Sequence, residues 1–172
     1  MLENDFQLMK IAYFVAKSDS SDPRTNTGAV ISKGYKLLGM GANSVSKKLE
    51  VLPHMLEREN KKHYINHAEK KAIAECAKYE NSTRDATMHL NWEPCSSCAL
   101  SIIDSGITEL VLHKELNDFY RANKSDSYWL KDQDIALKIL KDVGVKVRYL
   151  EGKIFEPKDN FFINFRGEKF FP

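Results

Sequence analysis

Two short segments of the chain carry the side chains best suited to bind a metal ion and to move protons beside it. The first is His67-Ala68-Glu69, and the second is Pro94-Cys95-Ser96-Ser97-Cys98. Zinc prefers imidazole and thiolate ligands in a tetrahedron, and a catalytic zinc takes three ligands from the protein and keeps the fourth position for water. His67, Cys95 and Cys98 supply that number of ligands, which predicts a catalytic zinc centre.

The positions of these residues within the predicted helices favour the same chemistry. Cys95 and Cys98 lie in the first turn of one helix, where both thiols point to the same side and exposed backbone N–H groups stabilise the thiolate form. His67 opens a second helix, which places Glu69 near the metal without requiring it to be a ligand. Zinc lowers the pKa of a bound water toward ~7, and a carboxylate beside the metal can shuttle protons, which is the role predicted for Glu69.

The two segments also permit three alternatives to a catalytic zinc centre. A thioredoxin-like redox pair would use Cys95 and Cys98 but would leave His67-Ala68-Glu69 without a role. A closed structural zinc site would need a fourth ligand, for which Cys76 or His89 is available. A chance coincidence of the two half-motifs is the third alternative. The remaining histidines are interpreted as ordinary surface or strand residues: His54, His63, His89 and His113.

The elements that must position the site follow from hydrophobic periodicity and breaker residues. Asn4-Asp5 is predicted to cap a helix through about Lys17. Further helices are predicted over residues 66–78, 95–104 and 127–143, and strands over residues 27–32, 37–43, 86–92, 108–113 and 145–150. Residues 44–66 form a long connection that we interpret as a functional flap. The helical crossover between the last two strands implies that they run parallel. The fold class is therefore α/β, with a mixed five-stranded sheet between two helical layers.

Length and composition limit the possible functions. The 172 residues suffice for one domain, 1–172, with a core of about 4–150 and a tail, 151–172, predicted to pack on the domain or on a neighbouring subunit. The 26 Lys+Arg against 24 Asp+Glu give a net charge of only +2, which does not favour a polynucleotide partner. The odd number of cysteines, 3, does not suit a disulfide framework. No apolar stretch approaches the ~18 residues of a membrane span, and the chain is expected to be cytoplasmic.

The chain resembles a known enzyme family beyond its metal-binding residues. The arrangement H-x-E…P-C-x-x-C resembles the signature of zinc-dependent nucleobase deaminases. The stretch Ser20-Ser21-Asp22-Pro23-Arg24-Thr25-Asn26-Thr27-Gly28-Ala29-Val30-Ile31 resembles the S-x-D-P-x-T-x-x-G-A-V-I segment of deoxycytidylate (dCMP) deaminases, and Arg58, His63-Tyr64 and residues 91–99 add further matches. The resemblance covers about residues 6–150. It implies the cytidine deaminase fold, a Zn²⁺ cofactor, and hydrolysis of dCMP to dUMP and ammonia in pyrimidine deoxynucleotide metabolism.

The resemblance also implies roles for individual residues. Glu69 would be the catalytic acid and base, and His67, Cys95 and Cys98 would hold the zinc. Asn43 would contact the substrate near its sugar or base, the backbone N–H of Ala68 would meet the pyrimidine carbonyl, and Tyr64 would join the substrate-binding set. Arg24 is the candidate for the 5′-phosphate, because a guanidinium binds phosphate oxygens in pairs. The expected partners are a small-molecule nucleotide and further copies of the chain in a homo-oligomer, with no membrane.

One motif departs from the family pattern. Allosterically regulated dCMP deaminases carry Gly-Tyr-Asn-Gly where this chain has Gly41-Ala42-Asn43-Ser44, so feedback by dCTP and dTTP is not expected, and another free nucleotide, nucleoside or base stays open as substrate. A polynucleotide-editing deaminase would need a basic, aromatic groove, whereas Lys47-Lys48 and Lys61-Lys62 are interpreted as solvated faces. A non-catalytic binding module would predict loss of a ligand or of Glu69, and all four residues are present.

Overall fold

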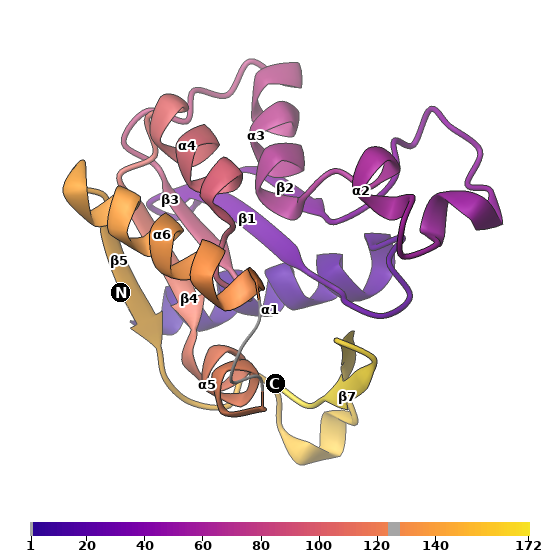
Figure 1. Ribbon diagram of the computed structural model, residues 1–172. Helices are drawn as coiled ribbons and strands as arrows, with labels where there is room; N and C mark the ends of the chain where they lie inside the picture. The colour runs from indigo at the N-terminus through magenta and orange to yellow at the C-terminus, as the bar shows by residue number, and fades with distance from the viewer. Residues whose placement is uncertain (1, 124–127) are drawn as a thin grey trace.

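The computed structural model describes residues 2–123 and 128–172, and a five-stranded sheet forms the centre of the fold (Figure 1). The strands lie in the order β2 (Lys36–Ala42), β1 (Gly28–Lys33), β3 (Thr87–Leu90), β4 (Glu109–His113) and β5 (Lys146–Leu150). β1 pairs antiparallel with β2 and β3, and β3, β4 and β5 run parallel. The predicted mixed sheet and the parallel last pair of strands are therefore confirmed.

Helices cover both faces of this sheet. α3 (Ala68–Lys78), α4 (Ser96–Asp104) and α6 (Tyr128–Asp142) lie in front of it in Figure 1, whereas α1 (Leu2–Asp19) lies behind it. Successive strand residues point to opposite faces. Accordingly Leu110 and Leu112 of β4 enter the core under α3, α4 and α6, whereas Val111 enters the core under α1 and α5 (Lys114–Asn123). The predicted three-layer architecture is confirmed.

Two predictions about helices were incomplete. α1 begins at Leu2, so Asp5 is not a cap; it is buried, and its carboxylate binds His89 and Arg148. α5 was not predicted, because it follows β4 without a turn residue between them. The helix predicted over residues 127–143 is α6, which is described from Tyr128; residue 127 lies outside the described residues.

The long connection between β2 and α3 contains two short helices, η1 (Pro53–Leu56) and α2 (Lys61–Tyr64). An isolated bridge between Ser44 and Asn66 closes its base. The connection therefore projects as one loop from the edge of the domain, next to the first turn of α3 (Figure 1).

The C-terminal tail packs on the second core, which is the one that lies under α1 and α5. After η2 (Pro157–Asp159) it forms a hairpin of β6 (Ile163–Phe165) and β7 (Glu168–Phe170). Ile163, Phe165 and Phe170 are buried together with residues of α1 and α5. Among the helices of the described residues, none has the length and apolar character needed to cross a membrane.

Candidate metal centre and active-site cavity

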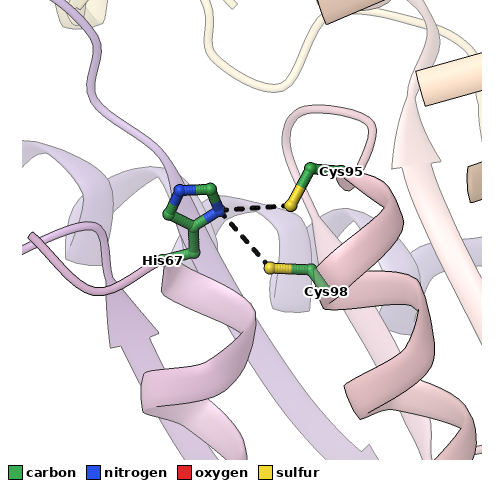
Figure 2. A group of neighbouring side chains, drawn as sticks. All are labelled: His67, Cys95 and Cys98. Carbon is green, nitrogen blue, oxygen red and sulfur yellow. Dashed lines mark hydrogen bonds between the residues drawn. The ribbon is translucent and has the colours of Figure 1, made fainter. Parts of the chain in front are cut away.

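His67, Cys95 and Cys98 come together where α3 and α4 begin. His67 is the residue before the first turn of α3, and Cys95 holds the same position in α4. The Nδ1 atom of His67 lies 3.5 Å from the Sγ atom of Cys95 and 3.4 Å from that of Cys98. Figure 2 shows both sulfur atoms directed at this one ring nitrogen. The two segments identified in the sequence therefore form one cluster.

The geometry of the cluster fits zinc. Ligands at ~2.0 Å (nitrogen) and ~2.3 Å (sulfur) from a tetrahedral ion lie about 3.5 Å apart, which matches the two nitrogen–sulfur distances. All three ligand atoms lie within 4.8 Å of one another. One imidazole and two thiolates are a donor set that selects zinc.

The structure removes the candidates for a fourth protein ligand. Among the described residues, only His67, Cys95 and Cys98 form a metal-binding group of His, Cys, Asp and Glu side chains. Cys76 is buried in the core between β2 and α3, and His89 lies on the opposite face of the sheet, where its Nε2 atom is 2.9 Å from Asp5. Three protein ligands characterise a catalytic site, which keeps one position open.

The electrostatics of the cluster favour a thiolate at Cys95. A hydrogen bond from the thiol of Cys98 lowers the pKa of Cys95 to about 4, and the same bond raises the pKa of Cys98. The hydrogen bond with Cys95 raises the pKa of His67. Cys95 is therefore the first of the pair to become a thiolate, and a metal ion would compete with the proton that the two sulfur atoms share.

Glu69 lies in the first turn of α3, beside the cluster. Its side chain is 5% exposed and lines the cavity described below. Burial raises the pKa of Glu69, and the nearby His67 partly opposes this shift. Burial therefore weakens the preference of this carboxyl group for its ionised form, which suits a group that must take up and return a proton.

Close packing fixes α3, and with it His67 and Glu69, against the sheet. A Cβ atom on Gly41 of β2 would lie 2.6 Å from the backbone nitrogen of Ala72 and 2.8 Å from the carbonyl oxygen of Ala68. Only glycine allows this approach of strand and helix. The first turn of α3 therefore has little freedom to shift.

A carboxylate from α6 fixes the start of α4. Asp132 accepts hydrogen bonds from the backbone N–H of Ser96 (3.0 Å) and from its hydroxyl (2.6 Å). A carboxylate at a helix N-terminus satisfies N–H groups that have no partner within the helix. Asp132 therefore holds the turn that carries both cysteines.

The loop that leads to Cys95 is fixed through Glu93, whose side chain is almost fully buried. Its carboxylate accepts hydrogen bonds from Arg121 (2.7 Å) and Tyr149 (2.6 Å). Its backbone N–H donates to Asn117, and its carbonyl oxygen accepts from Gln133. Side chains of α5, α6 and β5 thus position the loop before the metal ligands.

A cavity of about 720 Å³ opens beside the metal cluster, and His67, Glu69 and Cys95 line it. Trp92 and Trp129 form an aromatic part of its wall, with ring centroids 6.0 Å apart and Trp129 6.2 Å from the ring of His67. Five side chains in the lining are cationic: Arg24, Arg58, Lys61, Lys62 and Arg166. The cavity therefore combines a flat apolar wall with a positive rim.

Of the four substrate-binding residues predicted from the sequence, two line the cavity. Arg24 and Asn43 line the cavity, and Ala68 is the first residue of α3, next to His67. Tyr64 is not among the described residues that line the cavity; its ring contacts His54 instead, at a centroid distance of 5.6 Å.

The side chain of Asn43 holds the loop around Arg24. Its Oδ1 atom accepts hydrogen bonds from the backbone N–H of Thr27 (2.9 Å) and the hydroxyl of Ser20 (2.7 Å). Its Nδ2 atom donates to the carbonyl oxygen of Thr25. These bonds give Asn43 a structural role in the cavity wall.

Sequence reasoning missed part of the positive rim. Lys61 and Lys62 were interpreted as a solvated face, but both line the cavity, and Lys61 binds the carboxylate of Asp22 at 2.6 Å. Arg166 was not singled out. The pair Arg166-Gly167 is not one of the residue pairs that mark a two-residue hairpin in a sequence, so no local signal pointed to it.

Comparisons with known proteins place these residues in a family. Residues 2–114 match the model for the cytidine and deoxycytidylate deaminase zinc-binding region. Among curated proteins, the deoxycytidylate deaminase of Homo sapiens is 29% identical over 134 residues, which cover 74% of this chain and 68% of that protein. The tRNA-specific adenosine deaminase of Buchnera aphidicola subsp. Baizongia pistaciae is 32% identical over 113 residues, which cover 64% of this chain and 62% of that protein.

Solved structures show the same fold. The crystal structure of dCMP deaminase from the cyanophage S-TIM5 in complex with dCMP and dUMP superposes with a TM-score of 0.66 at 20% identity. The match covers 86% of this chain and 96% of that chain.

Proposed function

The chain belongs to the cytidine and deoxycytidylate deaminase family of zinc-dependent hydrolases, and we propose that within this family it deaminates a free cytosine nucleotide, with dCMP converted to dUMP and ammonia. The similarity to the human deoxycytidylate deaminase supports the choice of dCMP. The products would enter pyrimidine deoxynucleotide metabolism.

The charge distribution of the cavity carries this proposal. Two of its carboxylates are paired with cations: Asp22 with Lys61 at 2.6 Å, and Glu93 with Arg121 at 2.7 Å. The remaining cationic side chains, among them Arg24 and Arg166, therefore give the rim an excess of positive charge. A phosphate group complements such a rim, whereas an uncharged nucleoside or base gains nothing from it.

The chain's own residues account for the proton transfers of the reaction. When bound at His67, Cys95 and Cys98, zinc supplies Lewis-acid activation of the attacking water. Glu69 accepts one proton of that water and passes it to the ring nitrogen of cytosine; it then takes the second proton from the hydroxyl group now on C4 and delivers it to the amine, which leaves as ammonia while the C4 carbonyl forms. The substrate and one water molecule thereby yield uracil and ammonia. The N–H of Ala68 is suited to bind the pyrimidine carbonyl, because a first-turn N–H has no partner within its helix.

A substrate panel tests the proposal. Ammonia release by the zinc-loaded protein is measured for dCMP, CMP, deoxycytidine, cytosine, guanine and dCTP under the same conditions. We expect dCMP to have the highest kcat/KM, at least ten-fold above deoxycytidine, because a charge-assisted contact with phosphate contributes ~1.5 to 3 kcal/mol. Equal values of kcat/KM for dCMP and deoxycytidine would refute the assignment to a nucleotide.

A second candidate function is deamination of a base within a polynucleotide. The 32% identity to the tRNA-specific adenosine deaminase favours it. Adding an RNA stem-loop with an unpaired adenosine, and a single-stranded DNA containing cytosine, to the same panel separates the two functions. Turnover of either polynucleotide above that of dCMP would replace the first proposal with the second.

A further inference from the structure

Arg166 occupies a turn that normally takes a different residue. Phe165 pairs with Glu168, so Arg166 and Gly167 form the two-residue loop between β6 and β7. Their φ angles are 55° and 91°, both positive, as a type I′ turn requires. Asn, Asp or Gly is favoured at the first position, because a longer L side chain seldom adopts this conformation. Residues held in such conformations are concentrated at functional sites.

The hairpin that carries Arg166 is firmly attached to the loop that carries Arg24. The backbone N–H of Asn26 donates to the carbonyl oxygen of Asn164 (2.7 Å), and the N–H of Asn164 donates to the Asn26 side chain (2.8 Å). The N–H of Gly167 donates to the carbonyl oxygen of Arg24 (2.8 Å). These three bonds fix the turn relative to Arg24.

Aromatic packing fixes the other side of the hairpin. Phe165 is fully buried, and its ring contacts Trp92 at a centroid distance of 5.1 Å and Tyr120 at 6.0 Å. Trp92 itself lines the active-site cavity. The turn therefore sits at a defined place beside the cavity.

Arg24 and Arg166 both line the cavity, and the turn that carries Arg166 lies next to the side chain of Arg24. The guanidinium of Arg166 is 5.7 Å from the ring centroid of Tyr120. A Cβ atom on Gly167 would lie 3.3 Å from Nη2 and 3.6 Å from Nε of Arg24, so the Arg24 guanidinium lies beside the turn. Both arginines line the cavity that contains Glu69.

From this arrangement we propose that Arg166, together with Arg24, binds the 5′-phosphate of the substrate and that Arg166 sets the preference for a nucleotide over a nucleoside. The inference rests on the proposed function and extends it to a residue of the C-terminal hairpin. Two guanidiniums held by separate segments can bind different oxygens of one phosphate. Because the hairpin is fixed before the substrate arrives, little conformational freedom is lost on binding.

The test uses a substitution that removes the phosphate-binding side chain without destabilising the turn, so that an effect on substrate binding can be told from an effect on folding. Arg166→Asn removes the guanidinium but introduces a residue that a type I′ turn favours. We expect the thermal midpoint of this variant to equal or exceed that of the wild type. Its ratio of kcat/KM for dCMP to kcat/KM for deoxycytidine should fall ten-fold or more. Calorimetric titration with dUMP and with deoxyuridine should show the same loss of phosphate preference without turnover.

A matched control lies on the same hairpin. Lys169→Ala also removes one positive charge, but Lys169 is exposed in β7 and stacks over Phe162 at 4.3 Å, outside the lining of the cavity. We expect its dCMP-to-deoxycytidine ratio to stay within two-fold of the wild type. A comparable fall in both variants would indicate a general effect of charge and would overturn the role of Arg166.

The outcomes distinguish this inference from the proposed function. If the wild type prefers dCMP and binds dUMP more tightly than deoxyuridine, and Arg166→Asn keeps both preferences, the inference is wrong and the proposed function stands. If the wild type itself shows no preference for the phosphorylated compound in turnover or in binding, both are wrong.

Discussion

At the scale of single residues, the separate roles of Glu69 and the metal ligands lead to a sharp prediction. Glu69→Gln keeps the size of the side chain but removes the group that accepts and returns protons, so the zinc content should stay near one per chain. Turnover should fall by ~10⁴-fold or more, because one carboxylate serves several proton transfers. Elemental analysis and ammonia release on the same preparation measure both quantities.

Cys95→Ala is the matched comparison, because it removes a ligand and should lose zinc together with activity. Loss of zinc in the Glu69→Gln variant would instead make Glu69 a ligand or a structural residue. Near-normal turnover of that variant would contradict the mechanism.

The metal ligands could be predicted from the sequence because their chemistry is local. His67, Cys95 and Cys98 each stand at or within the first turn of a helix, and their residue types alone select zinc. Arg24 could be predicted as a phosphate-binding residue because it lies in the stretch of residues 20–31, which resembles a segment of the family. Arg166 could not be found in that way, because a tertiary contact between the hairpin and the loop of residues 22–27 brings it to the cavity.

At the scale of elements, the close contact between β2 and α3 predicts the effect of one methyl group. In Gly41→Ala the added Cβ would lie 2.6 to 2.8 Å from atoms of α3, and the helix must move away from the strand. We expect a loss of ~1 to 3 kcal/mol in the free energy of unfolding. Because the first turn of α3 carries His67 and Glu69, we also expect faster loss of zinc to a chelator.

Gly144→Ala provides the control for this prediction. Gly144 has a φ of 83° and no atom within 4 Å of an added Cβ, and it follows α6, away from the metal ligands. Its substitution should cost ~1 to 2 kcal/mol through backbone strain, with zinc release unchanged. Equal zinc release by both variants and the wild type would show that α3 tolerates the displacement.

Helices and strands could be predicted from the sequence where a Gly or Pro residue marks their ends or where their hydrophobic residues recur with a clear period. Gly144 marks the boundary between α6 and β5, whereas α5 starts at Lys114 directly after His113 of β4 with no Gly or Pro between them. The β6–β7 hairpin has strands of only three residues and carries Arg166 where Asn is usual. Packing against the second core, rather than local preference, stabilises both elements.

At the scale of the whole molecule, the buried contact between α1 and the sheet predicts how stability depends on pH. Burial lowers the pKa of His89, although Asp5 and Glu109 oppose this shift and Arg148 adds to it. The folded chain therefore resists protonation of His89, whereas the unfolded chain binds a proton below pH ~6.5. Stability should be fully present above that pH and decrease as the pH falls below it.

The His89→Gln variant isolates this contribution. Both proteins carry the same metal centre, so the effect of pH on the metal cancels in their difference. Between pH 7.5 and 5.5 the free energy of unfolding of the wild type should decrease by up to ~1.4 kcal/mol more than that of the variant. Denaturant titrations at the two pH values provide the measurement, and parallel pH dependences would contradict the assignment.

The position of the C-terminal hairpin has a consequence for how such a protein evolves. The metal ligands and Glu69 lie between residues 67 and 98, whereas the hairpin that contributes Arg166 to the cavity wall lies between residues 163 and 170. Mutations in the codons of the hairpin alter the cavity wall while the metal centre is inherited intact. Natural selection can thus change which molecules such an enzyme accepts without passing through inactive ancestors.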